Sequence, residues 1–285
     1  MRFDPDQIDT LVTIVEEGTF EAAARRLQLT PSAVSQRIRA LERAAGQVLI
    51  SRVTPCNATA AGAPLVRLGR QLRLLSAETA AALGEEDVVE LSVAVNADSL
   101  ATWFRPVLDA VAGRGSTALR LHIEDQAYSH DLLRRGDVLA AVTSEPTPVQ
   151  GCVVEPLGRL RYLPAAAPSL LQRHRADATM PMVVFNEKDR LQDDALAARG
   201  DQRPTVVHRV PSTADFHEAI CRGLGWGMVP EPHLGAELAA GRLARIPGGR
   251  HVDVPLFWQR WRLEGPALAA LTDDVRRAAA ALRRK

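Results

Sequence analysis

Cysteine is scarce, and the cysteines present follow no recognisable pattern. The three, Cys56, Cys152 and Cys221, lie far apart, and none belongs to a CxxC pair. Their odd number and wide spacing argue against a disulfide framework and against a structural zinc site. The seven histidines are scattered in the same way. We therefore expect neither a metal nor a cofactor.

Long apolar runs are also missing. No stretch approaches the ~18 consecutive apolar residues that a membrane-spanning helix requires. No apolar segment of the kind found in signal peptides follows the first residues. These absences predict a cytoplasmic protein that does not bind membranes.

Familiar catalytic motifs are absent as well. The chain contains no GxSxG, HExxH or P-loop sequence. The glycine-rich stretch 223–227 precedes a predicted strand and does not open a helix, which is the wrong context for a dinucleotide site. We therefore expect that the protein is not an enzyme. An enzyme on a two-lobed α/β scaffold is an alternative, and turnover of an amino acid would support it.

Arginine supplies nearly all of the positive charge, because only Lys188 and Lys285 are lysine. The net charge is +1, and 46% of the 285 residues are hydrophobic, enough for two domains with sizeable cores. The charges are distributed unevenly. Residues 25–52 carry six arginines and one acid, whereas residues 1–21 carry six acids and one arginine. This segregation indicates a basic surface suited to nucleic acid.

Three helices are predicted before residue 46. Apolar residues at i, i+3, i+4 and i+7 from Ile8 predict a first helix that ends at Gly18. A short second helix follows, and a third runs from Pro31 to about Ala45 with Thr30 as its N-cap. Two short helices joined by a tight turn form a helix-turn-helix, whose second helix enters the DNA major groove.

The outer face of the third helix is polar. Serine hydroxyls can bind phosphate oxygens, and glutamine and arginine can bond to adenine and guanine edges. A turn at residues 55–59 would form a wing. The predicted DNA contacts are Thr30, Ser32, Ser35, Gln36, Arg37, Arg39, Arg52 and Asn57. For Asn57 the alternative is that it shapes the turn and does not contact DNA. For the three helices the alternative is an ordinary helical bundle whose charges are solvated.

Several segments resemble the signature of LysR-type transcriptional regulators. They are AAARRL at 22–27, TPSAVSQRI at 30–38, LE at 41–42, LISR at 49–52 and TAAG at 59–62. The sequence departs from the family's pattern at Pro31, where many members have glutamine, and at Ile50, where phenylalanine is commoner. The resemblance implies an all-α winged helix-turn-helix at residues 1–59. Its partners would be a double-stranded DNA operator and RNA polymerase.

Residues 60–84 are predicted to form a linker helix. Leucines spaced alternately three and four residues apart form a heptad seam, made by Leu65, Leu68, Leu72 and Leu75. A seam this short is not stable alone and must pack against another apolar surface. One candidate surface is the second domain of the same chain. The family resemblance implies the same helix of a second copy. A homodimer or homotetramer would then place two recognition helices on one duplex.

From residue 88 onward, strand and helix signals alternate, which predicts an α/β fold. We expect strands at 88–95, 119–124, 138–143, 182–185, 206–210, 226–229 and 254–258, and helices at 99–112, 131–135 and 268–282. The resemblance implies a two-lobed effector domain, similar to periplasmic binding proteins, at residues 88–285. Lobe I would comprise 88–161 and 264–285, and lobe II 162–263.

Polar residues follow several of these strands. Ligands of open α/β sheets bind beyond the carboxyl ends of strands and at helix N-termini. The predicted effector contacts are Asn96, Asp98, Ser99, Glu124, Asp125, Thr143 and Asn186. Each can instead be a helix cap or a loop residue. Together they offer a helix N-terminus for a carboxylate and acidic groups for ammonium or guanidinium, which fits a basic amino acid.

A narrower resemblance covers nearly the whole chain. Segments 91–103, 133–138, 183–186, 228–230 and 237–243 are similar to the ArgP/LysG branch of the family. Members of this branch sense lysine or arginine and activate a gene for a basic-amino-acid exporter. The resemblance therefore implies a regulator with lysine or arginine as its effector, and leaves histidine open. The alternatives are a LysR-type regulator with another effector and a two-lobed solute-binding protein without a role on DNA.

Overall fold

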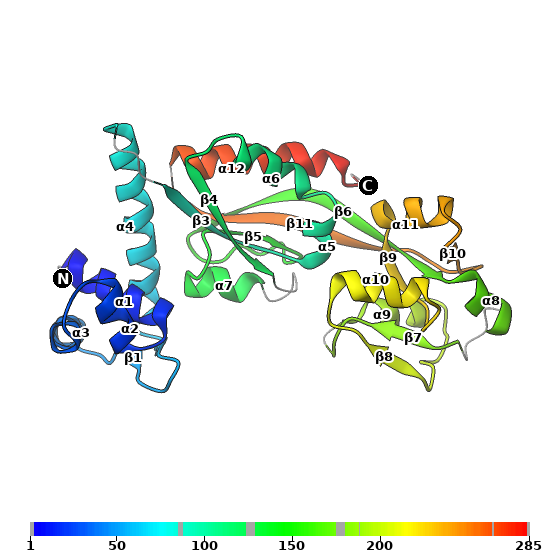
Figure 1. Cartoon of the computed structure of the whole chain (residues 1–285), viewed down its shortest axis with the longest axis horizontal. Helices are drawn as coiled ribbons and strands as arrows, with labels where there is room; N and C mark the ends of the chain where they lie inside the picture. The colour runs from blue at the N-terminus through cyan, green and yellow to red at the C-terminus, as the bar shows by residue number, and fades with distance from the viewer. Residues whose placement is uncertain are drawn as a thin grey trace.

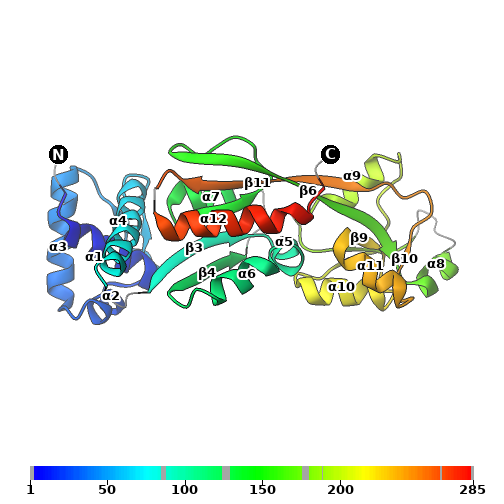
Figure 2. The same ribbon diagram turned by 90° about the horizontal axis from the view of Figure 1, so that it is seen from above.

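The computed structural model describes residues 3–84, 88–123, 129–174, 180–187, 189–263 and 265–283. The described parts form an elongated molecule (Figure 1). A small helical unit and a long helix lie at one end, one α/β lobe lies in the middle, and a second lobe lies at the far end. The same order is visible in the turned view (Figure 2). Among the described residues, no helix is long and apolar enough to cross a bilayer.

The N-terminal unit contains three helices and a short hairpin. They are α1 (Pro5–Glu17), α2 (Phe20–Arg26), α3 (Pro31–Ala45), β1 (Ile50–Ser51) and β2 (Asn57–Ala58). Side chains cap each helix: Asp4, Thr19 and Thr30 each accept a hydrogen bond from a backbone N–H of the first turn. The cap at Thr30 confirms the prediction. Apolar residues of all three helices meet in one core, which fixes the angle between α2 and α3.

The linker helix α4 (Ala63–Ala82) packs along α1. Gly69 allows this close approach, because a Cβ there would lie 2.5 Å from Cγ2 of Val12 and 2.7 Å from Cγ2 of Ile8. The heptad leucines are divided between environments. Leu65 and Leu72 join the core of the N-terminal unit, whereas Leu68 and Leu75 are 37% and 39% exposed.

Lobe I is a sheet covered by helices on both faces. Its strands β3 (Val89–Val95), β4 (Thr117–Ile123) and β5 (Ala140–Thr143) are parallel, in the order β5-β3-β4. Helices α6 (Arg105–Ala112) and α12 (Pro266–Ala278) cover one face, and α7 (Ser129–Arg135) covers the other (Figure 1). A 3₁₀ turn, Ala279–Ala281, follows α12.

Two long antiparallel strands connect the lobes. They are β6 (Cys152–Ala166) and β11 (Val252–Trp261). The end of β11 pairs with β5 from Phe257 to Arg260, so these residues lie in the sheet of lobe I. The other end of β6 pairs with β9 (Gly227–Pro230) and β10 (Ala244–Arg245) of lobe II. The chain therefore passes from one lobe to the other within β6 and within β11. The sequence instead predicts that the return from lobe II to lobe I comes after β11, at residues 263/264.

Lobe II is smaller and mostly helical. A parallel pair, β7 (Met182–Val184) and β8 (Val207–Arg209), lies near β9. The helices of this lobe are α8 (Pro168–His174), α9 (Leu191–Ala197), α10 (Thr213–Cys221) and α11 (Glu231–Ala239). The predicted strands at 182–185, 206–210 and 226–229 are thus present within about a residue or two.

One predicted helix was wrong, and several elements, helices α8 to α11 and strand β6 among them, were not predicted. The helix predicted at 99–112 is two helices, α5 (Ala97–Ala101) and α6, because Pro106 has no N–H to continue the first one. Strand β6 was not predicted at all. It contains Pro156 and Pro164, which count against a strand in sequence reasoning, and its register with β11 shifts opposite Pro156 and Gly158.

Candidate functional site

The recognition face of α3 presents a mixed polar surface. Ser32, Gln36 and Arg39 are exposed, and Ser35 is partly buried. Thr30 serves as the N-cap, because its Oγ1 accepts from the N–H of Ala33. These positions are compatible with groove contacts, since no neighbouring element of the described chain packs over the exposed side chains.

Arg37 lies differently from its neighbours. Its guanidinium turns back to α1, 3.4 Å from Oγ1 of Thr10 and 3.3 Å from Oδ2 of Asp6. The Asp6 carboxylate is 75% exposed, so this ion pair is weak. In this arrangement Arg37 supports the packing of α3 on α1 and does not extend from the recognition face.

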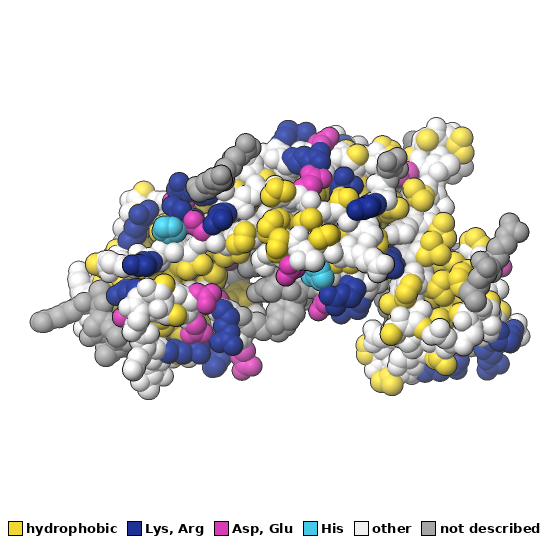
Figure 3. Space-filling model, turned by 180° about the vertical axis from the view of Figure 1, so that it is seen from behind, with side chains coloured by type: hydrophobic (Ala, Val, Ile, Leu, Met, Phe, Trp, Pro, Cys, Tyr) yellow, Lys and Arg dark blue, Asp and Glu magenta, His cyan; other side chains and the backbone are white. Residues whose placement is uncertain are grey.

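The wing is built around β1 and β2. Arg52 is exposed, and its guanidinium carbon lies 5.4 Å from the ring centroid of Phe20 at the start of α2. The amide of Asn57 donates to the carbonyl oxygen of Pro55 over 2.8 Å, so here this side chain shapes the turn. Figure 3 shows arginine side chains gathered along the lower edge of the N-terminal unit, at the right of that view.

A cavity of about 620 Å³ lies between the two lobes. Lobe I contributes residues at the carboxyl ends of β3 and β4, and lobe II contributes the loop after β7 and the first turns of α9 and α10. Its volume lies in the usual range of small-molecule sites. The lining residues are Asn96, Ala97, Asp98, Ile123, Tyr162, Phe185, Asn186, Glu187, Asp189, Leu191, Gln192, Pro211, Thr213, Phe216 and Met228.

Two buried amide oxygens in this cavity lack partners. Oδ1 of Asn96, in lobe I, and Oε1 of Gln192, in lobe II, have no hydrogen-bond partner within the described part of the chain. The Nε2 of Gln192 donates to the carbonyl oxygen of Val183 over 3.0 Å, which fixes the orientation of its amide. Because buried polar atoms are normally hydrogen-bonded, these two acceptors indicate where a ligand's N–H groups would bind.

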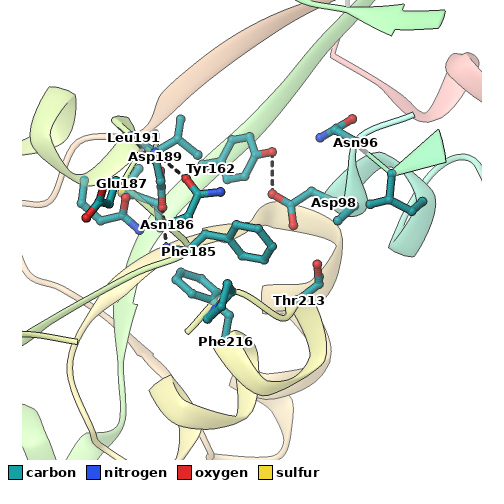
Figure 4. Close-up of a pocket in the computed structure, with 15 residues that line it drawn as sticks. Asn96, Asp98, Tyr162, Phe185, Asn186, Glu187, Asp189, Leu191, Thr213 and Phe216 are labelled. Carbon is teal, nitrogen blue, oxygen red and sulfur yellow. Dashed lines mark hydrogen bonds between the residues drawn. The ribbon is translucent and has the colours of Figure 1, made fainter. Parts of the chain in front are cut away.

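The charged side chains of the described lining are all acidic. They are Asp98, Glu187 and Asp189. Oδ2 of Asp98 accepts a hydrogen bond from the hydroxyl of Tyr162 over 2.8 Å. Figure 4 shows the side chains of Asp98 and Asn186 pointing toward one another across the space between the lobes. An acidic cavity of this kind attracts a cationic ligand.

Asp189 has a structural role in the same region. Its carboxylate accepts from the backbone N–H groups of Phe185 and Leu191, at 2.9 and 3.1 Å. Its own N–H donates to Oδ1 of Asn186 over 3.2 Å. These bonds hold the loop after β7 in the shape that presents Asn186 and Phe185 to the cavity.

Aromatic rings form one wall of the cavity. Phe185 and Phe216 meet edge to face, with ring centroids 6.5 Å apart. In Figure 4 both rings lie beneath the space that Asp98 faces, with the Thr213 hydroxyl beside them. Thr213 is the first residue of α10, where backbone N–H groups and the helix dipole favour a carboxylate.

Some of the residues predicted to bind the effector line the cavity, and others do not. Asn96, Asp98 and Asn186 line the cavity. Ser99, within α5, is completely buried and is not part of the lining. Thr143 is also buried, and its hydroxyl donates to the carbonyl oxygen of Glu145 over 3.1 Å, away from the cavity. Glu124 and Asp125 lie outside the described residues.

Several lining residues were missed by sequence reasoning. They are Tyr162, Phe185, Gln192, Thr213 and Phe216. Tyr162 lies on β6, which was not recognised as a strand. The pair Ser212–Thr213 is a readable helix start, since Ser212 caps α10, and this signal could have identified the wall formed by α10.

Comparisons with known proteins extend over the whole chain. Residues 5–63 match the family model described as bacterial regulatory helix-turn-helix protein, lysR family, and residues 84–280 match the LysR substrate binding domain. The lysine export transcriptional regulatory protein LysG of Corynebacterium glutamicum is 48% identical over 286 residues, which cover 95% of this chain and 96% of that protein. A helix-turn-helix match of this kind is not expected of a solute-binding protein.

Two solved structures are similar over nearly their full lengths. ArgP from Mycobacterium tuberculosis has a TM-score of 0.89 and 46% identity, with 99% of both chains covered. Full-length LysG from Corynebacterium glutamicum, with bound effector Arg, has a TM-score of 0.82 and 46% identity, with 99% of this chain and 100% of that chain covered.

Proposed function

The chain belongs to the LysR family of bacterial transcriptional regulators, a family of DNA-binding proteins and not of enzymes, and on this basis we propose that it senses a basic amino acid. Lysine or arginine is the proposed effector, and a gene for an amino-acid exporter is the proposed target. One observation carries the proposal: the cavity combines acidic side chains with two unpaired buried amide oxygens, one from each lobe. Only a ligand rich in N–H donors can pair with the acidic side chains and also bond to the two amide oxygens.

The cavity suggests a binding pose. The cationic end of the bound amino acid's side chain pairs with Asp98. Its N–H groups bond to Oδ1 of Asn96 and Oε1 of Gln192. The aliphatic stem lies against Phe185 and Phe216. The α-carboxylate binds at the N-terminus of α10 beside Thr213.

Ligand contacts on both lobes would change their relative positions. An effector that touches Asn96 in lobe I and Gln192 in lobe II stabilises a closed arrangement in proportion to its differential affinity for that state. Arg70 of α4 offers a route to the DNA-binding unit. Its guanidinium donates to Oδ1 of Asp137 in lobe I over 2.9 Å and lies 3.6 Å from Oε1 of Glu16 in α1.

The DNA-binding assembly would contain two copies or four. Leu68 and Leu75 leave an apolar strip exposed on α4, and Figure 3 shows hydrophobic side chains on this helix. Burying the strip against a second α4 places two α3 helices on one operator. RNA polymerase is the proposed further partner, and the cytoplasm the proposed compartment.

Calorimetric titration of the purified protein with lysine, arginine, histidine and leucine tests the effector. We expect saturable binding of lysine or arginine, no binding of leucine, and an effector-dependent footprint on DNA upstream of its gene. Asp98→Asn should abolish this binding, whereas Glu187→Gln, at an exposed acid of the same cavity, should weaken it only slightly. Normal arginine and lysine affinity in Asp98→Asn would refute the pose.

A further inference from the structure

A second group of polar side chains lies behind the cavity wall in lobe II. His217 and Cys221 are one helical turn apart on α10, and Glu237 faces them from α11. One ligating atom from each lies within 4.8 Å of the others. Nε2 of His217 is 3.1 Å from Oε1 of Glu237, and Sγ of Cys221 is 3.8 Å from Oε2 of Glu237.

We propose that His217, Cys221 and Glu237 bind a divalent transition-metal ion, with zinc as the preferred ion. Imidazole nitrogen, thiolate sulfur and carboxylate oxygen are the ligand types that zinc uses. Bonds of about 2.0–2.3 Å in tetrahedral geometry separate neighbouring ligand atoms by roughly 3–4 Å. The separations of Glu237 from His217 and from Cys221, 3.1 and 3.8 Å, fall in this range, and all three ligating atoms lie within 4.8 Å of one another. Three protein ligands leave the fourth position for water. This assignment is independent of which effector the cavity takes.

The i, i+4 spacing on a helix makes the geometry reproducible. Residues four apart lie on the same face, so α10 presents His217 and Cys221 together without any loop rearrangement. Glu237 is 9% exposed and is therefore held in place, whereas His217 is 21% exposed, which leaves a path for the ion. The spacing of histidines and cysteines along the chain predicted no such site.

Glu237 already bonds to another side chain, Arg242, which competes with a metal ion for the carboxylate. Arg242 donates to Oε1 of Glu237, the same oxygen that His217 approaches. Without a metal, these groups form an ordinary hydrogen-bonded ion network. The Arg242 side chain is 54% exposed, so it can move into solvent when a cation takes its place. Oε2, near Cys221, is available to the ion without this movement.

The position of the site links it to the effector cavity. Phe216, beside His217 on α10, is part of the cavity wall. On α11, Nε2 of His233 lies 3.1 Å from the carbonyl oxygen of Ala101 in lobe I. A metal that joins α10 to α11 would therefore connect a wall of the cavity to a contact between the lobes.

Cobalt(II) titration of the full-length protein without an affinity tag tests this assignment. We expect one equivalent of cobalt to bind, with a thiolate-to-cobalt charge-transfer band in the near ultraviolet, and zinc to displace it. Cys221→Ser should abolish the band, and Glu237→Gln should weaken binding by roughly tenfold or more. Cys152→Ala, at a buried cysteine outside the cluster, should leave the band unchanged.

Circular dichroism of each variant establishes that the fold is retained. Two results would overturn the assignment: no stoichiometric cobalt binding by the wild-type protein, or a thiolate band that persists in a folded Cys221→Ser variant.

Discussion

The hydroxyl of Tyr162 donates a hydrogen bond to Oδ2 of Asp98 over 2.8 Å, and so joins strand β6 to helix α5 at the cleft between the lobes. The carboxylate is held in one orientation before a ligand arrives. Pre-orientation of this kind lowers the entropy that a binding event must remove. In the proposed binding pose, Tyr162 therefore acts on the effector through Asp98.

Tyr162→Phe tests this relationship. Removing the hydroxyl leaves Asp98 less constrained, and we expect the Kd for lysine or arginine to rise about five- to tenfold, since a hydrogen bond of this type contributes about 1–1.5 kcal/mol. Calorimetry measures the change. Binding of operator DNA without effector should stay as in the wild-type protein. An unchanged Kd would show that Tyr162 does not position Asp98.

Gly69→Ala tests the contact between α4 and α1. The added methyl group would lie 2.5 Å from Cγ2 of Val12, a stiff buried side chain, so we expect a destabilisation of about 1–3 kcal/mol. Gly235→Ala, in helix α11, is the matched control because the methyl group added there would meet nothing within 4 Å. Thermal unfolding should show a lower Tm for the first variant and an equal or slightly higher Tm for the second.

Arg39→Ala tests the DNA face of α3. Losing one phosphate contact should weaken binding to all sequences and reduce the slope of log K against log salt by about 1. Arg37→Ala should change that slope less, because Arg37 turns back toward Asp6 and Thr10. Fluorescence anisotropy at several salt concentrations separates the two. Equal slopes for both variants would contradict the orientation of Arg37.

Gln36→Ala is expected to affect base readout rather than the salt slope. Gln36 is exposed on the recognition face, where its amide can bond bidentately to adenine. We expect a loss of about 1–3 kcal/mol of discrimination at one operator position. Competition with single-base operator variants measures it, and unchanged discrimination at every position would rule out direct readout by Gln36.

Leu68→Glu tests the proposed contact between linker helices. A charge at the centre of a buried apolar strip is costly, so we expect the oligomer to dissociate at concentrations where the wild-type protein stays associated. Leu224→Glu is the control, since Leu224 is 40% exposed in lobe II, close to the 37% of Leu68. Sedimentation velocity reports both. An unchanged oligomeric state in Leu68→Glu would show that the interface does not include Leu68.

Arg161 and Asp253 give the effector domain an acid-sensitive bond. They pair across β6 and β11, with Nε of Arg161 2.7 Å from Oδ1 of Asp253. Hydrogen bonding to Arg161 holds the pKa of Asp253 below its usual value. A carboxyl group with a lowered pKa stabilises the fold above its unfolded pKa, about 3.9, and loses this effect as pH falls through the folded value.

Asp253→Asn should therefore lower the Tm at pH 5, and the difference from the wild-type protein should narrow as the pH falls below about 4. Thermal unfolding at matched ionic strength from pH 5 to 3 measures this trend. A difference that is constant over this range would mean that the pair contributes nothing through its charge.

Local signals in the sequence were enough for the N-terminal unit. The cap at Thr30, the glycine stop at Gly18 and a helical period of apolar residues are all encoded within a few residues, and each is observed. The parallel strands of lobe I were predicted for the same reason, since β3 and β4 carry apolar residues at alternate positions and β5 is a short apolar run. The positions of Asn96 and Asp98 followed from the rule that ligands bind at strand ends.

Only the tertiary structure brought Tyr162 to Asp98, Gln192 to the far wall, and Glu237 to His217 and Cys221. Tyr162 lies on β6, a strand that its prolines hide from local reasoning. Glu237 meets His217 and Cys221 because α10 and α11 both pack on β6 in lobe II. Composition and spacing thus determined the DNA-binding unit and the α/β class. Long-range packing, which no local pattern encodes, decided which residues line the cleft and which form the proposed metal site.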